Sequence, residues 1–160
     1  MSIQPGSTIP DIPIQVIDGD VRSRQTGELF AKHDVVLFGV PGAFTPTCSN
    51  RHVPGYIAHY GEFERRGITV MCLAVNDAYV MQAWASSLQV PAGLLMLADG
   101  NGSFTRALGL ELDGTSFGMG LRARRFALYA QDGVVRLLHV EAPGELRVST
   151  AESMLAAVEH

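Results

Sequence analysis

Two short apolar runs constrain the fold of this chain most strongly. They read VVLFGV at residues 35–40 and ITVMCLAV at residues 68–75, and neither contains a charged side chain. Continuous runs of this length are typical of strands buried on both faces, as the strands of a parallel sheet are. Parallel strands need a long crossover, and residues 47–66 are predicted to form a helix with an interruption at Pro54-Gly55.

The rest of the chain alternates in the same way. Residues 126–130 and 134–140 flank Gln131-Asp132-Gly133, which is typical of a hairpin. Further strands are expected at residues 12–17 and 94–97, and further helices at residues 77–88, 101–108 and 150–158. This order predicts an α/β fold with a central mixed β-sheet flanked by helices, compatible with a thioredoxin-like core.

The composition indicates one globular domain over residues 1–160. With 47% apolar and 18% charged residues, the chain is too apolar to be disordered. Its net charge of −4 argues against a nucleic-acid partner, because proteins that neutralise phosphates are basic. No apolar stretch is long enough to span a membrane, and residues 1–5 lack the features of a secretory signal. We therefore expect a cytoplasmic protein whose thiols are reduced at rest.

The most informative segment is PGAFTPTC at residues 41–48, which joins the first buried strand to the next helix. Ligands of α/β proteins bind at the carboxyl ends of such strands. Thr45 is a good N-cap and Pro46 is favoured as the first helical residue, so Cys48 falls in the first turn. Unpaired N–H groups and the helix dipole lower a thiol pKa there, which makes Cys48 a candidate nucleophile. The alternative is a small buried core residue.

A fast thiol catalyst also needs a fixed cation near its sulfur, to stabilise negative charge on the departing group. The cluster Arg122-Ala123-Arg124-Arg125, just before the predicted hairpin, is the best source of one. Spacing alone does not choose among its three arginines. The histidines, His160 included, show no metal-ligand spacing, and two cysteines are too few for a thiolate zinc site, so no metal is expected.

Three segments of the chain carry a family resemblance. They are PGAFTPTCSNRHVPGY at residues 41–56, VNDAYVMQAW at residues 75–84 and RARRFALYAQDG at residues 122–133. The first contains the pattern Pro-x-x-x-Thr-x-x-Cys and resembles the peroxidatic segment of peroxiredoxins, and all three resemble the type II, peroxiredoxin 5-like subfamily. The resemblance covers nearly the whole chain. It implies a thioredoxin-fold, thiol-dependent peroxidase that reduces hydrogen peroxide and small organic hydroperoxides without metal, haem or flavin.

The resemblance also implies roles for four side chains. Cys48 is expected to be the peroxidatic cysteine, whose thiolate attacks the peroxide and becomes a sulfenic acid. Thr45 is expected to hydrogen-bond the thiolate and the peroxide, and Pro41 to shield the sulfur from water. Arg122 is expected to orient the thiolate and to stabilise charge on the departing oxygen. The other two arginines of the cluster receive no catalytic role.

Cys72 is the candidate resolving cysteine, because some type II members use a cysteine near this position. A straight helix over residues 47–66 would hold it about 15 Å from Cys48, beyond the ~7 Å Cα limit of a disulfide. A bridge would therefore require the start of the helix to unwind. The alternative is a buried core thiol, in which case glutathione with glutaredoxin, or thioredoxin, reduces Cys48. The resemblance also suggests a homodimer.

Three other functions compete with this interpretation. His52 follows Cys48 by four residues, and the pair could form an acyl-transfer site, but nothing specifies its third group or oxyanion hole. A thiol–disulfide oxidoreductase is disfavoured, because Thr45 stands where the first cysteine of a C-x-x-C motif would be. A redox sensor that is oxidised once is the non-enzyme alternative, and it has less need of a complete Thr45, Cys48 and Arg122 set.

Overall fold

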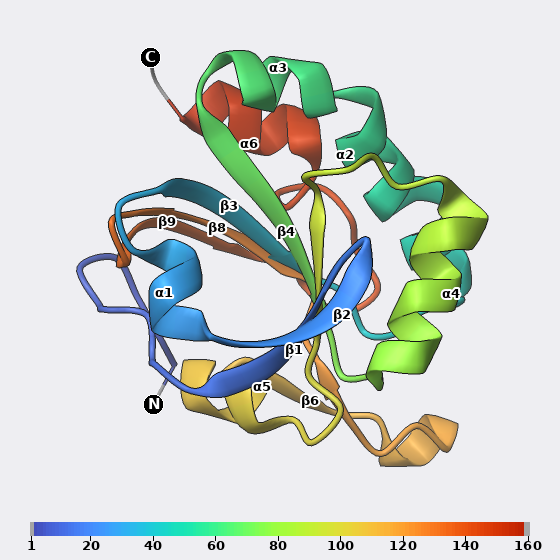
Figure 1. The fold of residues 1–160 in the computed structure, drawn as a ribbon. Helices are drawn as coiled ribbons and strands as arrows, with labels where there is room; N and C mark the ends of the chain where they lie inside the picture. Colours follow the sequence, from blue (N-terminus) through green and yellow to red (C-terminus); the bar gives the residue numbers. More distant parts are fainter. Residues whose placement is uncertain (1, 159–160) are drawn as a thin grey trace.

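Seven strands form one mixed sheet through the middle of the computed structural model, which describes residues 2–158 (Figure 1). Their order in the sheet is β2-β1-β5-β4-β3-β8-β9. Their bounds are β1 (Pro13–Asp18), β2 (Asp20–Gln25), β3 (Asp34–Gly39), β4 (Ile68–Ala74), β5 (Leu95–Ala98), β8 (Phe126–Gln131) and β9 (Val134–Val140). A separate antiparallel pair consists of β6 (Glu111–Asp113) and β7 (Leu121–Ala123).

The centre of the sheet is parallel, because β3 pairs with β4 and β4 pairs with β5 in the same direction. Strand β8 then runs antiparallel to β3, and β9 runs antiparallel to β8. The side chains of residues 35–38 are all fully buried, which explains why this run is apolar at every position. The predicted α/β architecture, with a mixed central sheet flanked by helices, is confirmed.

Helices cover both faces of the sheet and enclose two apolar cores (Figure 1). One core packs under α2, α3, α4 and α6 and includes Tyr56, Trp84 and Met154. The other packs under α1 and α5 and includes Phe30 and Phe104. The helices are α1 (Thr26–Phe30), α2 (Val53–Ala58), α3 (Tyr60–Arg65), α4 (Ala78–Leu88), α5 (Ser103–Leu108) and α6 (Ala151–Ala157). None of the helices described is both long and apolar enough to cross a membrane.

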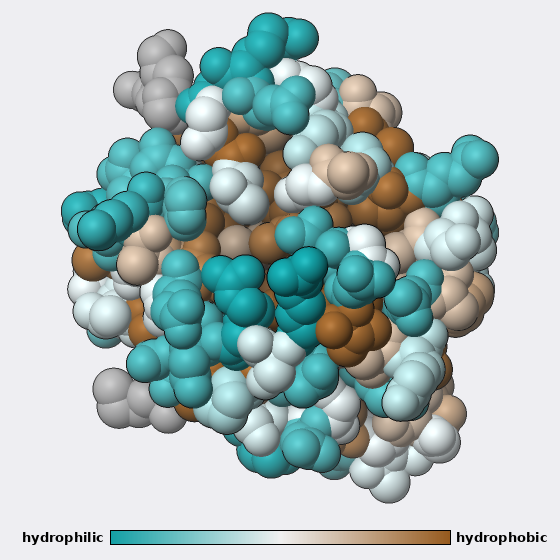
Figure 2. Space-filling model, viewed as in Figure 1, coloured by the Kyte–Doolittle hydropathy of each residue, from teal (hydrophilic) through white to brown (hydrophobic). Residues whose placement is uncertain are grey.

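Strand β2 and helix α1 have no counterpart in the elements predicted from the sequence. Strand β2 reads DVRSRQ, and all its residues are exposed, so it lacks the apolar alternation that marks a strand. It is held at the edge of the sheet by pairing with β1 alone. The face that these two strands present is largely hydrophilic (Figure 2). Helix α1 has five residues, too few for a helical period to show.

The helix after Cys48 breaks at a different place from the one predicted. The prediction of an interruption at Pro54-Gly55 is wrong, because α2 runs through both residues and the break falls at His59. One π-helical turn, η1 (Cys48–His52), precedes α2, and the N–H of Val53 donates to the carbonyl of Cys48. Pro54 thus stands in the first turn of α2, where its missing N–H is tolerated, and the wide turn before it accommodates its ring.

Candidate active site

The loop between β3 and η1 carries the candidate nucleophile and is anchored to β4 and the residues that follow it. The N–H of Val40 donates to the carbonyl of Leu73 at 3.0 Å, and the N–H of Ala43 donates to Asn76 Oδ1 at 2.9 Å. Phe44 has a φ of 63°, a left-handed conformation that a non-glycine residue keeps only where its surroundings enforce it. The loop is therefore fixed at the carboxyl edge of the parallel strands.

Cys48 lies in the first turn of the helix, as predicted. Residues 46 and 47 are already helical, and the carbonyl of Thr45 accepts the N–H of Ser49 at 2.9 Å. The thiol thus lies among N–H groups that have no partner within the helix. The hydroxyl of Thr45 differs from its predicted role, because it donates to the carbonyl of Gly42 at 2.7 Å rather than to the sulfur. Its lone pairs remain available as acceptors.

The sulfur of Cys48 is fully buried and lies beside a guanidinium group. Nη2 of Arg125 donates to Sγ of Cys48 at 3.2 Å. Within residues 2–158 Arg125 forms no salt bridge with a carboxylate, so its positive charge is not neutralised by one. A thiolate at this position would receive a charge-assisted hydrogen bond, roughly twice as strong as a neutral one.

This arginine is not the one that the resemblance implied. The guanidinium of Arg122 donates to the carbonyl of Met119 at 2.9 Å and to that of Val75 at 3.3 Å. It therefore ties the loop before β7 to the end of β4. The assignment of the thiolate-orienting role to Arg122 is corrected, because the structure places Arg125 at the sulfur.

Strand register explains the difference between the two arginines. Arg125 directly precedes β8, and the first residue of β8, Phe126, pairs with Gly39 at the end of β3. A Cβ at Gly39 would lie 2.1 Å from the Phe126 ring, so a glycine is required where the two strands meet. Arg122 belongs to the separate β6–β7 pair. The hairpin turn at residues 131–133 sets the register of β8 against β9 and not against β3, so the sequence alone did not single out Arg125.

His52 contacts the terminal nitrogen of the guanidinium that does not contact the sulfur. Its Nδ1 lies 2.9 Å from Nη1 of Arg125, and its Nε2 lies 3.0 Å from the carbonyl of Ser149. Burial lowers the pKa of His52 to about 4, the Ser149 hydrogen bond partly opposes this, and the charge of Arg125 lowers the pKa further. The ring is therefore neutral at pH 7. Since Arg125 and the carbonyl fix the donor directions, Nε2 carries the hydrogen and Nδ1 accepts.

We predict that His52 makes the folded state sensitive to mild acid. Its pKa falls from 6.5 to about 4 on folding, so the unfolded chain binds the proton first as the pH falls. The stabilisation is complete above pH 6.5 and is lost progressively down to about pH 4. It amounts to about 2 kcal/mol between pH 6.5 and pH 5. Urea unfolding of wild type and of His52→Gln at pH 7 and pH 5 measures it. A variant with the wild-type pH slope would contradict the assignment.

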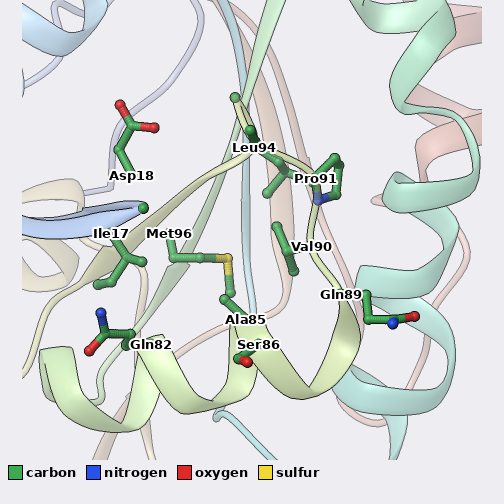
Figure 3. Close-up of a pocket in the computed structure, with 13 residues that line it drawn as sticks. Ile17, Asp18, Gln82, Ala85, Ser86, Gln89, Val90, Pro91, Leu94 and Met96 are labelled. Carbon is green, nitrogen blue, oxygen red and sulfur yellow. The ribbon is translucent and has the colours of Figure 1, made fainter.

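A pocket of about 190 Å³ opens beside Arg125. Its wall includes Pro41 and Thr47 from the cysteine loop and Leu112 from β6. A larger pocket, of about 410 Å³, lies elsewhere, between α4 and the ends of β1 and β5 (Figure 3). No cysteine, histidine or arginine lines the larger pocket.

Cys72 lies in β4, fully buried in the same apolar core as Cys48, and both thiols are free. Burial raises the pKa of the Cys72 thiol well above its ordinary value, negative charge at Cys48 raises it further, and Arg125 lowers it. The straight helix assumed in estimating the distance between the cysteines is absent, because the helix breaks at His59. No group of three potential metal ligands occurs within residues 2–158, and His160 lies outside the described residues.

Comparisons with known proteins identify one family. The Redoxin family model matches residues 4–155. The chain is 45% identical to chloroplastic peroxiredoxin-2E of Arabidopsis thaliana, over 98% of this chain and 70% of that protein. It is 47% identical to reduced Prx3 of Vibrio vulnificus in complex with hydrogen peroxide, with a TM-score of 0.91 over 97% and 95% of the two chains. Peroxiredoxin 5 of Alvinella pompejana is 35% identical, with a TM-score of 0.84 over 97% of each chain.

Proposed function

Since the chain belongs to the Redoxin family, and within it to the peroxiredoxins, it is a thiol-dependent peroxidase, and we propose that Cys48 is its peroxidatic cysteine. The observation that carries the assignment is the hydrogen bond from Arg125 to Sγ of Cys48. Cys72 has no such partner among the hydrogen bonds of the described residues, and its raised pKa keeps it protonated.

The proposed reaction is a displacement at a peroxide oxygen. The thiolate of Cys48 forms a bond to one oxygen, the O–O bond breaks, and the second oxygen leaves with the electron pair. That oxygen takes a proton and departs as water or as an alcohol, and Cys48 is left as a sulfenic acid. Arg125 is positioned to stabilise the charge that moves from sulfur to oxygen. The Thr45 hydroxyl, which already donates to Gly42, accepts a hydrogen bond from the peroxide O–H.

We propose hydrogen peroxide and small alkyl hydroperoxides as the substrates. The pocket beside Arg125, about 190 Å³ in volume, has room for a small organic group. Pro41 and Leu112 give its wall an apolar part, and Pro41 also limits the access of water to the sulfur. The similar Vibrio vulnificus protein has been crystallised with hydrogen peroxide, which supports the smaller substrate.

We propose further that an external thiol reduces the sulfenic acid, either glutathione with glutaredoxin, or thioredoxin. Cys72 is poorly suited to resolve it, because no guanidinium donates to its sulfur among the described residues and its raised pKa leaves little thiolate. The pocket lined by Pro41, Thr47 and Arg125 reaches the guanidinium that contacts Cys48, and we propose it as the approach of an outside thiol. A cytoplasmic location stays a prediction from the sequence.

Replacing Cys72 with serine is therefore expected to leave peroxide turnover within about two-fold of wild type with either reductant. Serine keeps the size of the side chain, so the main cost is a buried hydroxyl of about 1–3 kcal/mol in stability. Turnover with glutaredoxin plus glutathione and turnover with thioredoxin are measured separately, with circular dichroism as the folding control. A folded variant that loses turnover with both reductants would identify Cys72 as the resolving cysteine.

We also propose that the protein is a homodimer whose interface surrounds the Cys48 loop. Three large aromatic side chains are exposed, Phe44 of this loop by 56%, Tyr79 of α4 by 83% and Phe117 by 82%. Phe117 belongs to the turn η2 (Thr115–Phe117), which projects at the lower right of Figure 1. Met119, which follows that turn, lies against Gly42 of the Cys48 loop. Exposed aromatic side chains of this size mark association surfaces.

Replacing Tyr79 with aspartate is expected to shift the protein from dimer to monomer, because a charge at an apolar interface is costly. Sedimentation velocity measures the change, and Val21→Asp is the matched control, since Val21 is an exposed apolar residue on β2. The control should remain dimeric. A wild-type protein that sediments as a monomer at every concentration would refute the proposed interface.

A further inference from the structure

A buried carboxylate, that of Glu141, lies beyond His52 and also lines the pocket beside Arg125. We propose that Glu141 is a positioning residue, which reinforces the tautomer of His52 set by the Ser149 carbonyl and Arg125, and thereby the orientation of Arg125 at the sulfur of Cys48. The consequence for catalysis rests on the proposed role of Cys48. The predicted effect on the His52 tautomer is independent of that role, because it is measured in the reduced protein without peroxide.

The carboxylate of Glu141 organises the loop that follows β9. Its Oε2 accepts the N–H groups of Arg147, Val148 and Ser149, each at 2.8 Å, and the hydroxyl of Ser149 at 2.7 Å. Glu141 is 5% exposed. Burial alone would raise the pKa of its carboxyl, but the hydrogen bonds from Ser149, Arg147 and Val148 outweigh burial and lower it. The group is thus an anion held by four donors.

This anion and the Ser149 carbonyl together determine what His52 can bond to. Two oxygen atoms of Ser149 face Nε2 of His52, the carbonyl at 3.0 Å and Oγ at 3.4 Å. The hydroxyl hydrogen of Ser149 is directed at Glu141, so Oγ presents only lone pairs to the ring. Both oxygens are therefore acceptors, and Nε2 must carry the hydrogen.

The opposite nitrogen of the ring then has one possible role. With the hydrogen on Nε2 and a pKa of about 4, His52 presents a lone pair at Nδ1. Nη1 of Arg125 donates to that lone pair at 2.9 Å, while Nη2 of the same guanidinium donates to Cys48. The other tautomer would set an N–H of the histidine against an N–H of the arginine. It would push the guanidinium away from the sulfur.

Glu141 is also attached to Arg125 through the backbone. Its N–H donates to the carbonyl of Arg125 at 2.9 Å, one step beyond the last β8–β9 pair, Phe126 and Val140. The residue thus holds the main chain of the arginine directly and the side chain through Ser149 and His52. No salt bridge joins the two charges within the described residues, so the guanidinium is left for the sulfur.

The test uses Glu141→Gln, because glutamine keeps the shape of the side chain. Its NH₂ group can donate to the hydroxyl of Ser149, which then turns its hydrogen toward Nε2 of His52. We expect nitrogen NMR of the reduced protein to show only the Nε2–H tautomer in wild type and a population of the Nδ1–H tautomer in the variant. The rate constant for Cys48 oxidation by hydrogen peroxide should fall roughly 10- to 100-fold, as misplaced catalytic groups do.

The double variant Glu141→Gln with Ser149→Ala provides the rescue, because no hydroxyl remains to donate to Nε2. It should return His52 to the Nε2–H tautomer. The matched control is Asp99→Asn, another buried carboxylate, which accepts the N–H groups of Phe104 and Thr105 and has no bond to the site. It should change neither the tautomer nor the rate.

An unchanged His52 tautomer in folded Glu141→Gln would overturn the inference, whether or not the oxidation rate falls. A changed tautomer with a wild-type rate would overturn the link to Arg125. If wild-type Cys48 does not react with peroxide at all, the proposed function fails, and the tautomer measurement still decides the role of Glu141.

Discussion

Cys48→Ser is expected to abolish peroxide consumption. The hydroxyl of serine is not ionised at neutral pH, so the hydrogen bond from Arg125 would no longer stabilise an anion. The loss should be roughly 10³-fold or more, the scale on which enzymes lose activity when their nucleophile is removed. Serine is close to cysteine in size and occupies a fully buried position, so the fold should survive the change.

Peroxide consumption in the presence of excess reductant measures this loss. Cys72→Ser is the matched control, because it replaces a second, equally buried thiol in the same apolar core. Cys72→Ser should consume peroxide at nearly the wild-type rate, whereas Cys48→Ser should consume almost none. Turnover by Cys48→Ser at a rate near that of wild type would show that another group attacks the peroxide.

Arg125→Met is expected to slow the oxidation of Cys48 by roughly 10²- to 10³-fold, the usual cost of removing one donor aimed at developing charge. Methionine fills much of the space of the arginine stem but supplies no N–H and no charge. His52 would keep its place, because its Nε2 remains bonded to the Ser149 carbonyl. The fall in the oxidation rate should therefore come from the loss of the hydrogen bond to the sulfur of Cys48.

The matched variant is Arg122→Met, which removes a guanidinium three residues away. Arg122 binds the carbonyls of Met119 and Val75 and not the sulfur, so the loss should stay below about 10-fold. Stopped-flow measurement of the second-order rate constant with hydrogen peroxide compares the two. A larger loss in Arg122→Met than in Arg125→Met would restore the assignment that the resemblance implied.

The fold could be predicted from the sequence wherever a buried element shows as a recognisable run of apolar residues. The runs at residues 35–40 and 68–75 became β3 and β4 with end points shifted by at most one residue, because both faces of these strands are covered. Strand β2 left no such pattern, since its side chains are all exposed. The helix break was misplaced because Pro54 is tolerated in a first turn, a fact that depends on the π-helical turn before it.

The site could be predicted where it is local in sequence. The order Thr45, Pro46, Cys48 places the thiol in the first helical turn by capping rules alone. The arginine is 77 residues further along, and only the register of β8 against β3 distinguishes Arg125 from Arg122. Ser149 lies 97 residues from His52, in a loop without regular pattern, so no sequence signal connects the two.

Peroxide chemistry at Cys48 is tested most directly by the intact mass of reduced protein after a brief pulse of about one equivalent of hydrogen peroxide, followed by a peptide map. We predict one added oxygen, or a mixed disulfide if a small thiol is present, on the peptide that contains Cys48, with Cys72 unchanged. A peptide containing Cys48 that stays unmodified, while free cysteine in the same solution reacts as fast or faster, would contradict the account.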